Sequence, residues 1–163
     1  MPKGKLKGNA FELLIVKTIR KAVKRKYAND VVFRTPASGG HWKIGGADIT
    51  LEPALRKIFD VDIECKHQKT IKIHSFFETT KQFKDFMSQC LENCFENGGN
   101  PLLVFRGNRT PIFAATTLDA LKALKFDDLA KHSTPGLYLR FRGKIWKILL
   151  WKFIIKALKN KVD

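Results

Sequence analysis

Residues 45–66 read GGADITLEPALRKIFDVDIECK, and this stretch decides the fold that we expect. It contains two runs, 47–49 and 59–66, in which apolar and polar residues alternate as they do in β-strands. The link between the two runs holds Pro53, which favours a break between them. We therefore expect two strands that pair as a hairpin.

The second run has an apolar side and a charged side, because successive side chains of a strand point to opposite faces. The apolar set is Val61, Ile63 and Cys65, and the charged set is Asp62, Glu64 and Lys66. A hairpin can place Asp48 beside Glu64 and Lys66. Two carboxylates so close together favour a divalent cation, and Mg²⁺ accepts one or two carboxylates together with water and phosphate oxygens. The alternative is that these are solvated charges on the wet face of a strand.

Four segments in this order resemble a known family of nucleases. Asp48 followed by Glu64-x-Lys66 is similar to the core of PD-(D/E)XK nucleases. Residues 7–12, KGNAFE, resemble the K-G-x-x-F-E opening of archaeal-type Holliday junction resolvases, and residues 34–40, RTPASGG, resemble their R-x-x-x-S-G loop. The resemblance runs from Lys7 to about Arg106. One departure is Leu13, because the family often has a basic residue directly after the helix glutamate.

This resemblance implies a fold and an activity. The fold would be α/β, with a restriction-endonuclease-like mixed sheet flanked by helices in a single domain over residues 1–163. The protein would be a Mg²⁺-dependent endonuclease, with Mn²⁺ able to substitute. As a homodimer it would resolve four-way DNA junctions by two paired hydrolytic cuts. The alternatives are a PD-(D/E)XK nuclease that acts on duplex DNA, of the restriction or repair type, and a non-catalytic basic DNA-binding module.

The resemblance also assigns roles to individual residues. The catalytic set is Glu12, Ser38, Asp48, Glu64 and Lys66. The metal would be held by Asp48, Glu64, the backbone carbonyl of Cys65 and Glu12, the last directly or through water. Lys66 would orient or deprotonate the attacking water, or stabilise the charge that develops on the phosphate. The expected DNA contacts are Lys5, Lys7, Arg34, Ser38, His41, Lys43, Lys69 and Lys81.

Glu12 has a second interpretation. Apolar residues recur with helical spacing over residues 10–26, and Asn9 could cap this helix at its start. Glu12 follows Asn9 by three positions, as the acid of a capping box does. The sequence alone leaves both roles open.

The net charge of +16 is concentrated at the two ends of the chain. Residues 1–27 carry nine basic residues and one acid, and residues 137–163 carry eight basic residues and one acid. Such ends suit a polyanion, and the phosphate backbone of DNA is the partner that we expect. An anionic membrane surface is the second candidate, and we predict no membrane partner.

The three cysteines, at 65, 90 and 94, form no CxxC pair, and their odd number favours a reducing compartment. Together with the lack of a signal peptide, this predicts a protein of the prokaryotic cytoplasm, encoded by the cell or by a virus.

The remaining elements follow from periodicity and from turn residues. We expect a flexible basic arm at 1–8, a strand at 31–34, a glycine-rich loop at 35–46, a helix at 75–97 with Phe95 on its buried face, a hairpin of strands 102–106 and 111–116, a helix at 117–124, a turn or helix at 126–131 and a strand at 137–142.

Residues 137–163 form a basic, aromatic-rich C-terminal segment with two interpretations. Lysines fall on about half of a helical wheel over 144–159, which predicts an amphipathic helix. A strand to Leu150 followed by a helix fits as well. We expect the apolar residues between Ile145 and Leu158, or the hairpin 102–116, to supply part of a dimer interface.

Overall fold

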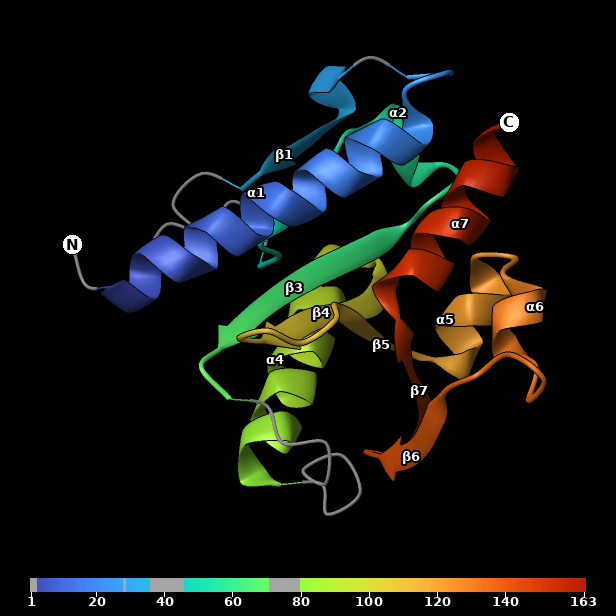
Figure 1. Cartoon of the computed structure of the whole chain (residues 1–163). Coiled ribbons are helices and arrows are strands. Elements are labelled where there is room, and N and C mark those ends of the chain that lie inside the picture. Colours follow the sequence, from blue (N-terminus) through green and yellow to red (C-terminus); the bar gives the residue numbers. More distant parts are fainter. Residues whose placement is uncertain (1–2, 28, 36–45, 71–79) are drawn as a thin grey trace.

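The computed structural model describes residues 3–27, 29–35, 46–70 and 80–163. In this part of the chain, seven strands form one sheet in the order β1-β2-β3-β4-β5-β7-β6 (Figure 1). The strands are β1 (Val32–Arg34), β2 (Ile49–Leu51), β3 (Val61–Gln68), β4 (Asn100–Gly107), β5 (Phe113–Thr117), β6 (Leu137–Phe141) and β7 (Lys144–Leu150). The helices are α1 (Lys3–Val23), α2 (Pro53–Arg56), α4 (Lys81–Asn97), α5 (Leu118–Ala123), α6 (Asp127–Ala130) and α7 (Trp151–Val162), and a 3₁₀ turn covers Asn29–Val31.

The sheet is mixed. The β3–β4 pair is parallel, and the other five pairs are antiparallel. A parallel pair requires a crossover, and α4 lies in the connection between β3 and β4. The predicted α/β class, a mixed sheet flanked by helices, is therefore confirmed. The predicted hairpin is also confirmed, because β2 pairs antiparallel with β3 and aligns Ile49 with Ile63.

Helices cover both faces of this sheet. On β4 the buried side chains alternate, so that Leu102 and Val104 belong to the core beneath α1 and α7, whereas Leu103 and Phe105 belong to the core beneath α4. Figure 1 shows α1 and α7 on the opposite side of the sheet from α4. Because both faces are covered, β3 is buried from Val61 to Cys65. The predicted charged face of β3 is therefore not a wet surface.

The C-terminal segment is a strand followed by a helix, so the prediction of one amphipathic helix over 144–159 is wrong. β7 pairs with β5 on one side and with β6 on the other, which fixes an extended backbone up to Leu150. Trp146, Trp151 and Leu158 are all buried within the fold. The apolar face that we expected at a dimer interface is thus mostly part of the core. The hairpin 102–116 is likewise internal, because β4 and β5 are both interior strands.

Three other predictions need correction. The helix α1 begins at Lys3, so residues 3–8 form its first turns instead of an arm, and Asn9 does not cap it. Phe95 is 93% exposed and does not share the buried face of α4 with Phe83, Met87 and Cys90. β5 begins at Phe113, two residues later than predicted. The predicted start of α4, at 75, falls outside the described residues, and the described helix begins at Lys81.

Candidate active site

Asp48 lies directly before β2, where three hydrogen bonds fix it. Its N–H donates to the carbonyl of Ile63 at 2.9 Å, and its own carbonyl accepts from the N–H of Thr35 at 3.0 Å. Its side-chain Oδ2 accepts from the N–H of Cys65 at 2.8 Å. The residue is 8% exposed. Backbone pairing between the segment before β2 and β3 therefore holds this carboxylate next to residue 64.

Glu64 lies on β3 with its side chain toward α4. Its Oε1 accepts from Lys66 Nζ at 2.5 Å, and its Oε2 accepts from Asn93 Nδ2 at 2.7 Å. Lys66 Nζ also donates to Gln89 Oε1 at 2.8 Å. The carboxylate is almost fully buried, since Glu64 is 1% exposed. A chain of side chains from β3 and α4 thus fixes both the acid and the ammonium.

Burial and nearby negative charge raise the cost of ionising Asp48. The pKa of Asp48 is raised to about 7, first by burial, then by the neighbouring charge of Glu64, and further by Glu12. The hydrogen bond from the Cys65 N–H and the charge of Lys66 act in the opposite direction. At neutral pH the Asp48 carboxyl is therefore poised between its neutral and its charged form.

Glu12 reaches the same region from α1 but is ion-paired. Its Oε2 accepts from Arg34 Nε, and Arg34 Nη2 donates to Asn9 Oδ1 at 2.9 Å. The capping-box role is wrong, because α1 begins two turns before Glu12. Instead, Asn9, Glu12 and Arg34 join α1 to the end of β1 beside Asp48.

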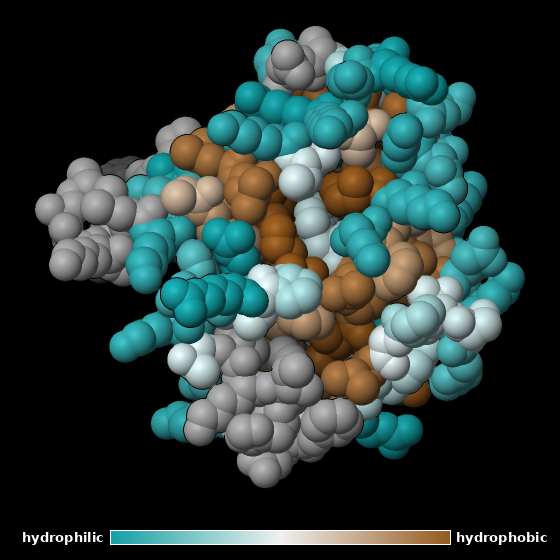
Figure 2. Space-filling model, in the orientation of Figure 1, coloured by the Kyte–Doolittle hydropathy of each residue, from teal (hydrophilic) through white to brown (hydrophobic). Residues whose placement is uncertain are grey.

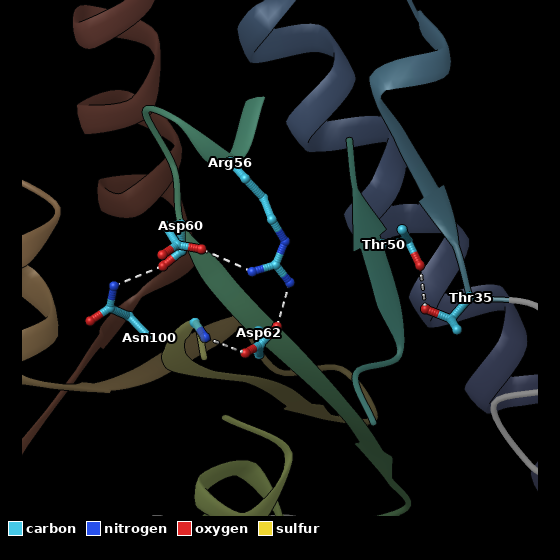
Figure 3. Close-up of polar contacts among 7 residues, drawn as sticks. Thr35, Thr50, Arg56, Asp60, Asp62 and Asn100 are labelled. Carbon is cyan, nitrogen blue, oxygen red and sulfur yellow. Dashed lines mark hydrogen bonds and ion pairs between the residues drawn. The ribbon is translucent and has the colours of Figure 1, made fainter. Parts of the chain in front are cut away.

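Asp62 shares a face of β3 with Glu64 but serves a different purpose. Its Oδ1 accepts from Arg56 Nη2 at 2.5 Å, and its Oδ2 accepts from the N–H of Gly99 at 3.0 Å. Figure 3 shows Arg56 between Asp60 and Asp62, with the Thr35–Thr50 hydroxyl pair on the neighbouring strands. A guanidinium thus neutralises Asp62 within the fold. Asp62 therefore has a structural role, unlike Glu64, although both lie on the same face of β3.

The structure brings some of the predicted site residues together and leaves others apart. Asp48, Glu64 and Lys66 are adjacent, and Glu12 with Arg34 adjoins them. Lys7, Lys69 and Lys81 are exposed. Ser38, His41 and Lys43 lie outside the described residues, as does the side chain of Lys5.

Comparison with protein families gives a match over most of the chain. A family model described as "Phage putative PDDEXK endonuclease" matches residues 3–139. The chain belongs to this family. No match is found among curated proteins or among solved structures.

Membership in this phage PD-(D/E)XK family establishes nuclease chemistry but does not specify the DNA substrate. The chain is a nuclease by family, and its mixed sheet with flanking helices agrees with the restriction-endonuclease-like fold. The match is to a phage family, and it does not support the archaeal-type resolvase subtype. Within the described residues, no helix is long and apolar enough to cross a membrane.

The donor set of this phage-type nuclease fits a hard divalent cation. In the described part of the chain, no three His, Cys, Asp or Glu residues are grouped closely enough to hold a metal by themselves. Two carboxylates, at 48 and 64, nevertheless meet in a buried place where their charges conflict. Mg²⁺ is commonly held by one or two carboxylates, with water and substrate phosphate completing its shell. The thiol of Cys65 is no candidate ligand, because burial raises its pKa well above its usual value.

Sequence reasoning missed two residues of the site, Gln89 and Asn93. They lie four positions apart on α4 and therefore share one face of the helix. That face lies against Lys66 and Glu64. Two amides at helical spacing, each next to one of the apolar positions Cys90 and Cys94, were the available signal. The crossover connection, and not the local sequence, decides which strand these two residues face.

Proposed function

We propose that this protein is a Mg²⁺-dependent endodeoxyribonuclease that cuts branched DNA, with the four-way junction as its preferred substrate. The observation that carries the proposal is the buried pair Asp48 and Glu64 beside Lys66, on a chain with a net charge of +16. A carboxylate pair of this kind has little structural value by itself, because Asp48 titrates only near pH 7. Membership in a PD-(D/E)XK family supports the same chemistry.

In this proposal Asp48 and Glu64 hold the metal, together with the backbone carbonyl of Cys65. Mn²⁺ would serve in place of Mg²⁺. When bound, the divalent ion would activate a water molecule and neutralise charge on the scissile phosphate. Glu12 supports the site through its charge beside Asp48 and through its ion pair with Arg34.

Lys66 supplies the positive charge of the site. Its ammonium is held between Glu64 Oε1 and Gln89 Oε1, and its Nζ lies 5.5 Å from the centre of the Phe86 ring. An ammonium fixed in this way needs little reorganisation to stabilise negative charge that builds up on a phosphate. The ammonium has a third N–H, which in this proposal donates to a water molecule or a phosphate oxygen. We assign Lys66 to charge stabilisation or to orientation of the attacking water.

The preference for junctions rests on the ordered sequence segments around residues 7–12 and 34–40. They place Asn9, Glu12 and Arg34 in one bonded group next to Asp48. Phosphate contacts from this group and from Lys7, Ser38, His41, Lys43, Lys69 and Lys81 would position the DNA. Paired cuts on a two-fold symmetric junction would require two copies of the chain.

The test is incubation of the purified protein with a synthetic four-way junction and with a duplex of matched sequence, each with and without Mg²⁺. We expect cutting of the junction only when Mg²⁺ or Mn²⁺ is present. Equal cutting of the duplex would favour a restriction- or repair-type nuclease. Binding without cutting under all metal conditions would favour the non-catalytic DNA-binding module.

A further inference from the structure

The outer face of the C-terminal half of α1, together with the turn that follows it, carries a row of cationic residues. Lys17, Lys21 and Lys24 are exposed, and Arg20 is half-buried beside them. These four residues, and no others among the described residues, line a shallow groove of about 300 Å³. In the same view as Figure 1, the space-filling surface shows hydrophilic side chains gathered over this part of α1 (Figure 2).

In the described part of the chain, no acid is paired with the three lysines of this row. None of the ion pairs among the described residues includes Lys17, Lys21 or Lys24. Arg20 is anchored differently, because its Nε donates to the carbonyl of Val32 at 2.8 Å. Asp30 and Glu52 line a neighbouring groove together with Arg20, whereas no acid lines the groove of the three lysines. Like charges this close repel one another, and a bound polyanion would relieve that repulsion.

The opposite face of the same helix decides which polyanion fits. Phe11, Ile15, Ile19 and Val23 are fully buried against the sheet and α7. An amphipathic helix binds a membrane by placing its apolar face among the lipids, and here that face is inside the protein. The exposed face offers charge alone, which suits the phosphate backbone of a nucleic acid.

We infer that the row Lys17–Lys21–Lys24 is a phosphate-binding track that grips one DNA arm beside the cut; this inference rests on the proposed nuclease function. The row spans about 10 Å along the helix, enough for about three phosphates of one strand at about 3.4 Å each. Along the helix axis, Lys17 lies about 8 Å from Glu12 and Lys24 lies about 18 Å from it. A duplex arm that follows α1 would therefore be held about two to five base pairs from the cut.

The test compares two triple variants that lose the same charge. Lys17→Gln/Lys21→Gln/Lys24→Gln removes the track and leaves Arg20 in place. The matched control, Lys122→Gln/Lys144→Gln/Lys156→Gln, removes three exposed lysines from α5, β7 and α7. Circular dichroism checks the fold of both, and fluorescence anisotropy in EDTA measures binding to a labelled junction without cutting.

We expect the track variant to bind at least tenfold more weakly than wild type at 100 mM salt, and the control to stay within threefold. The slope of log affinity against log salt should fall by about 2 to 3 in the track variant. Trimming the arms to three base pairs should remove most of the difference between wild type and the track variant. Cutting at saturating DNA should remain within threefold of wild type.

Track and control variants that bind alike, while wild type binds and cuts, would overturn the inference and leave the nuclease proposal intact. Wild type that binds through the track but never cuts would overturn the nuclease proposal alone. A second measurement tests binding of each protein to vesicles with 30% anionic lipid. If the track variant lost vesicle binding but kept the DNA affinity of wild type, the row would be a membrane-binding surface and the inference would be overturned. Wild type that binds no DNA would overturn both.

Discussion

At the scale of single residues, the site is a balance of charges that the fold holds in place. Glu64 is the centre of this balance, because it bonds to Lys66 and Asn93 and raises the pKa of Asp48. Its isosteric replacement Glu64→Gln should reduce junction cutting by more than about 100-fold, since it removes a ligand of the proposed metal and keeps the shape. Junction affinity in EDTA should not decrease, because the distributed lysines carry binding.

The matched control for this prediction is Glu92→Gln, which makes the same change on the exposed side of α4. It should cut at the wild-type rate, with circular dichroism spectra equal for all three proteins. Cutting by the Glu64 variant at wild-type rate would show that the site is elsewhere.

The raised pKa of Asp48 predicts how the stability of the metal-free protein depends on pH. Between the ordinary carboxyl value of 3.8 and about 7, the folded state holds a proton that the unfolded state has lost. The free energy of unfolding should therefore fall as pH rises through this window, by about 2 to 4 kcal/mol from this group. Urea unfolding at pH 5 and pH 8 in EDTA measures this fall.

Asp48→Asn is the control for the pH prediction, because it removes the titrating group at nearly constant size. The difference between pH 5 and pH 8 should shrink in this variant, and other titrating groups cancel in the comparison. Addition of Mg²⁺ should stabilise wild type at pH 8 more than the variant, because the bound cation favours the ionised pair. An equal pH response in both proteins would contradict the assignment.

At the scale of elements, α4 contributes two hydrogen-bond partners to the site, Gln89 and Asn93. This helix ends at a glycine. Gly98 has φ of 80°, in the left-handed region, and its N–H donates to the carbonyl of Cys94 at 2.8 Å. No atom lies within 4 Å of an added Cβ, so Gly98→Ala would cost only backbone strain. We expect a loss of about 1 kcal/mol, or about 3 °C in Tm. Gly98→Asn should lose less, since Asn tolerates this conformation better.

Thermal unfolding followed by circular dichroism distinguishes these two variants. Equal stability of wild type and both variants would mean that the helix end frays and that the turn is not fixed in solution. Retained cutting in all three proteins would confine the effect to stability.

At the scale of the whole molecule, the proposed paired cutting would require two copies of the chain, because each copy would contribute one Asp48–Glu64 pair. We expect sedimentation at micromolar concentration to give a dimer on junction DNA. Mixing wild type with excess Glu64→Gln should then convert paired cuts in a cruciform plasmid into single nicks. The control is wild type mixed with the same excess of Glu92→Gln, which should still linearise the plasmid. A monomer that nicks one strand per encounter would show that the protein is a nicking nuclease and would contradict the proposal of paired cuts.

The sequence by itself determined the centre of the sheet and the identity of the acids. Alternation over 59–66 predicted β3 with the correct faces, and the strand predicted at 102–106 is part of β4. The neighbours Asp48, Glu64 and Lys66 followed from one hairpin, because strand periodicity and a short connection are local properties of the chain. The helix predicted at 117–124 was likewise correct, and it is α5, which Thr117 caps by accepting from the Ala120 N–H.

Only the tertiary structure decided what those local patterns become. Residues 144–150 have a helical pattern of lysines, yet strands on both sides impose an extended backbone, because ladder hydrogen bonds and burial outweigh helix propensity. Asp62 and Glu64 look alike in the sequence, and a guanidinium from α2 makes one of them structural. Gln89 and Asn93 reach the site because the crossover between parallel strands places α4 over β3. Such partners are separated by more than twenty residues, so local periodicity carries no information about which side chains will meet.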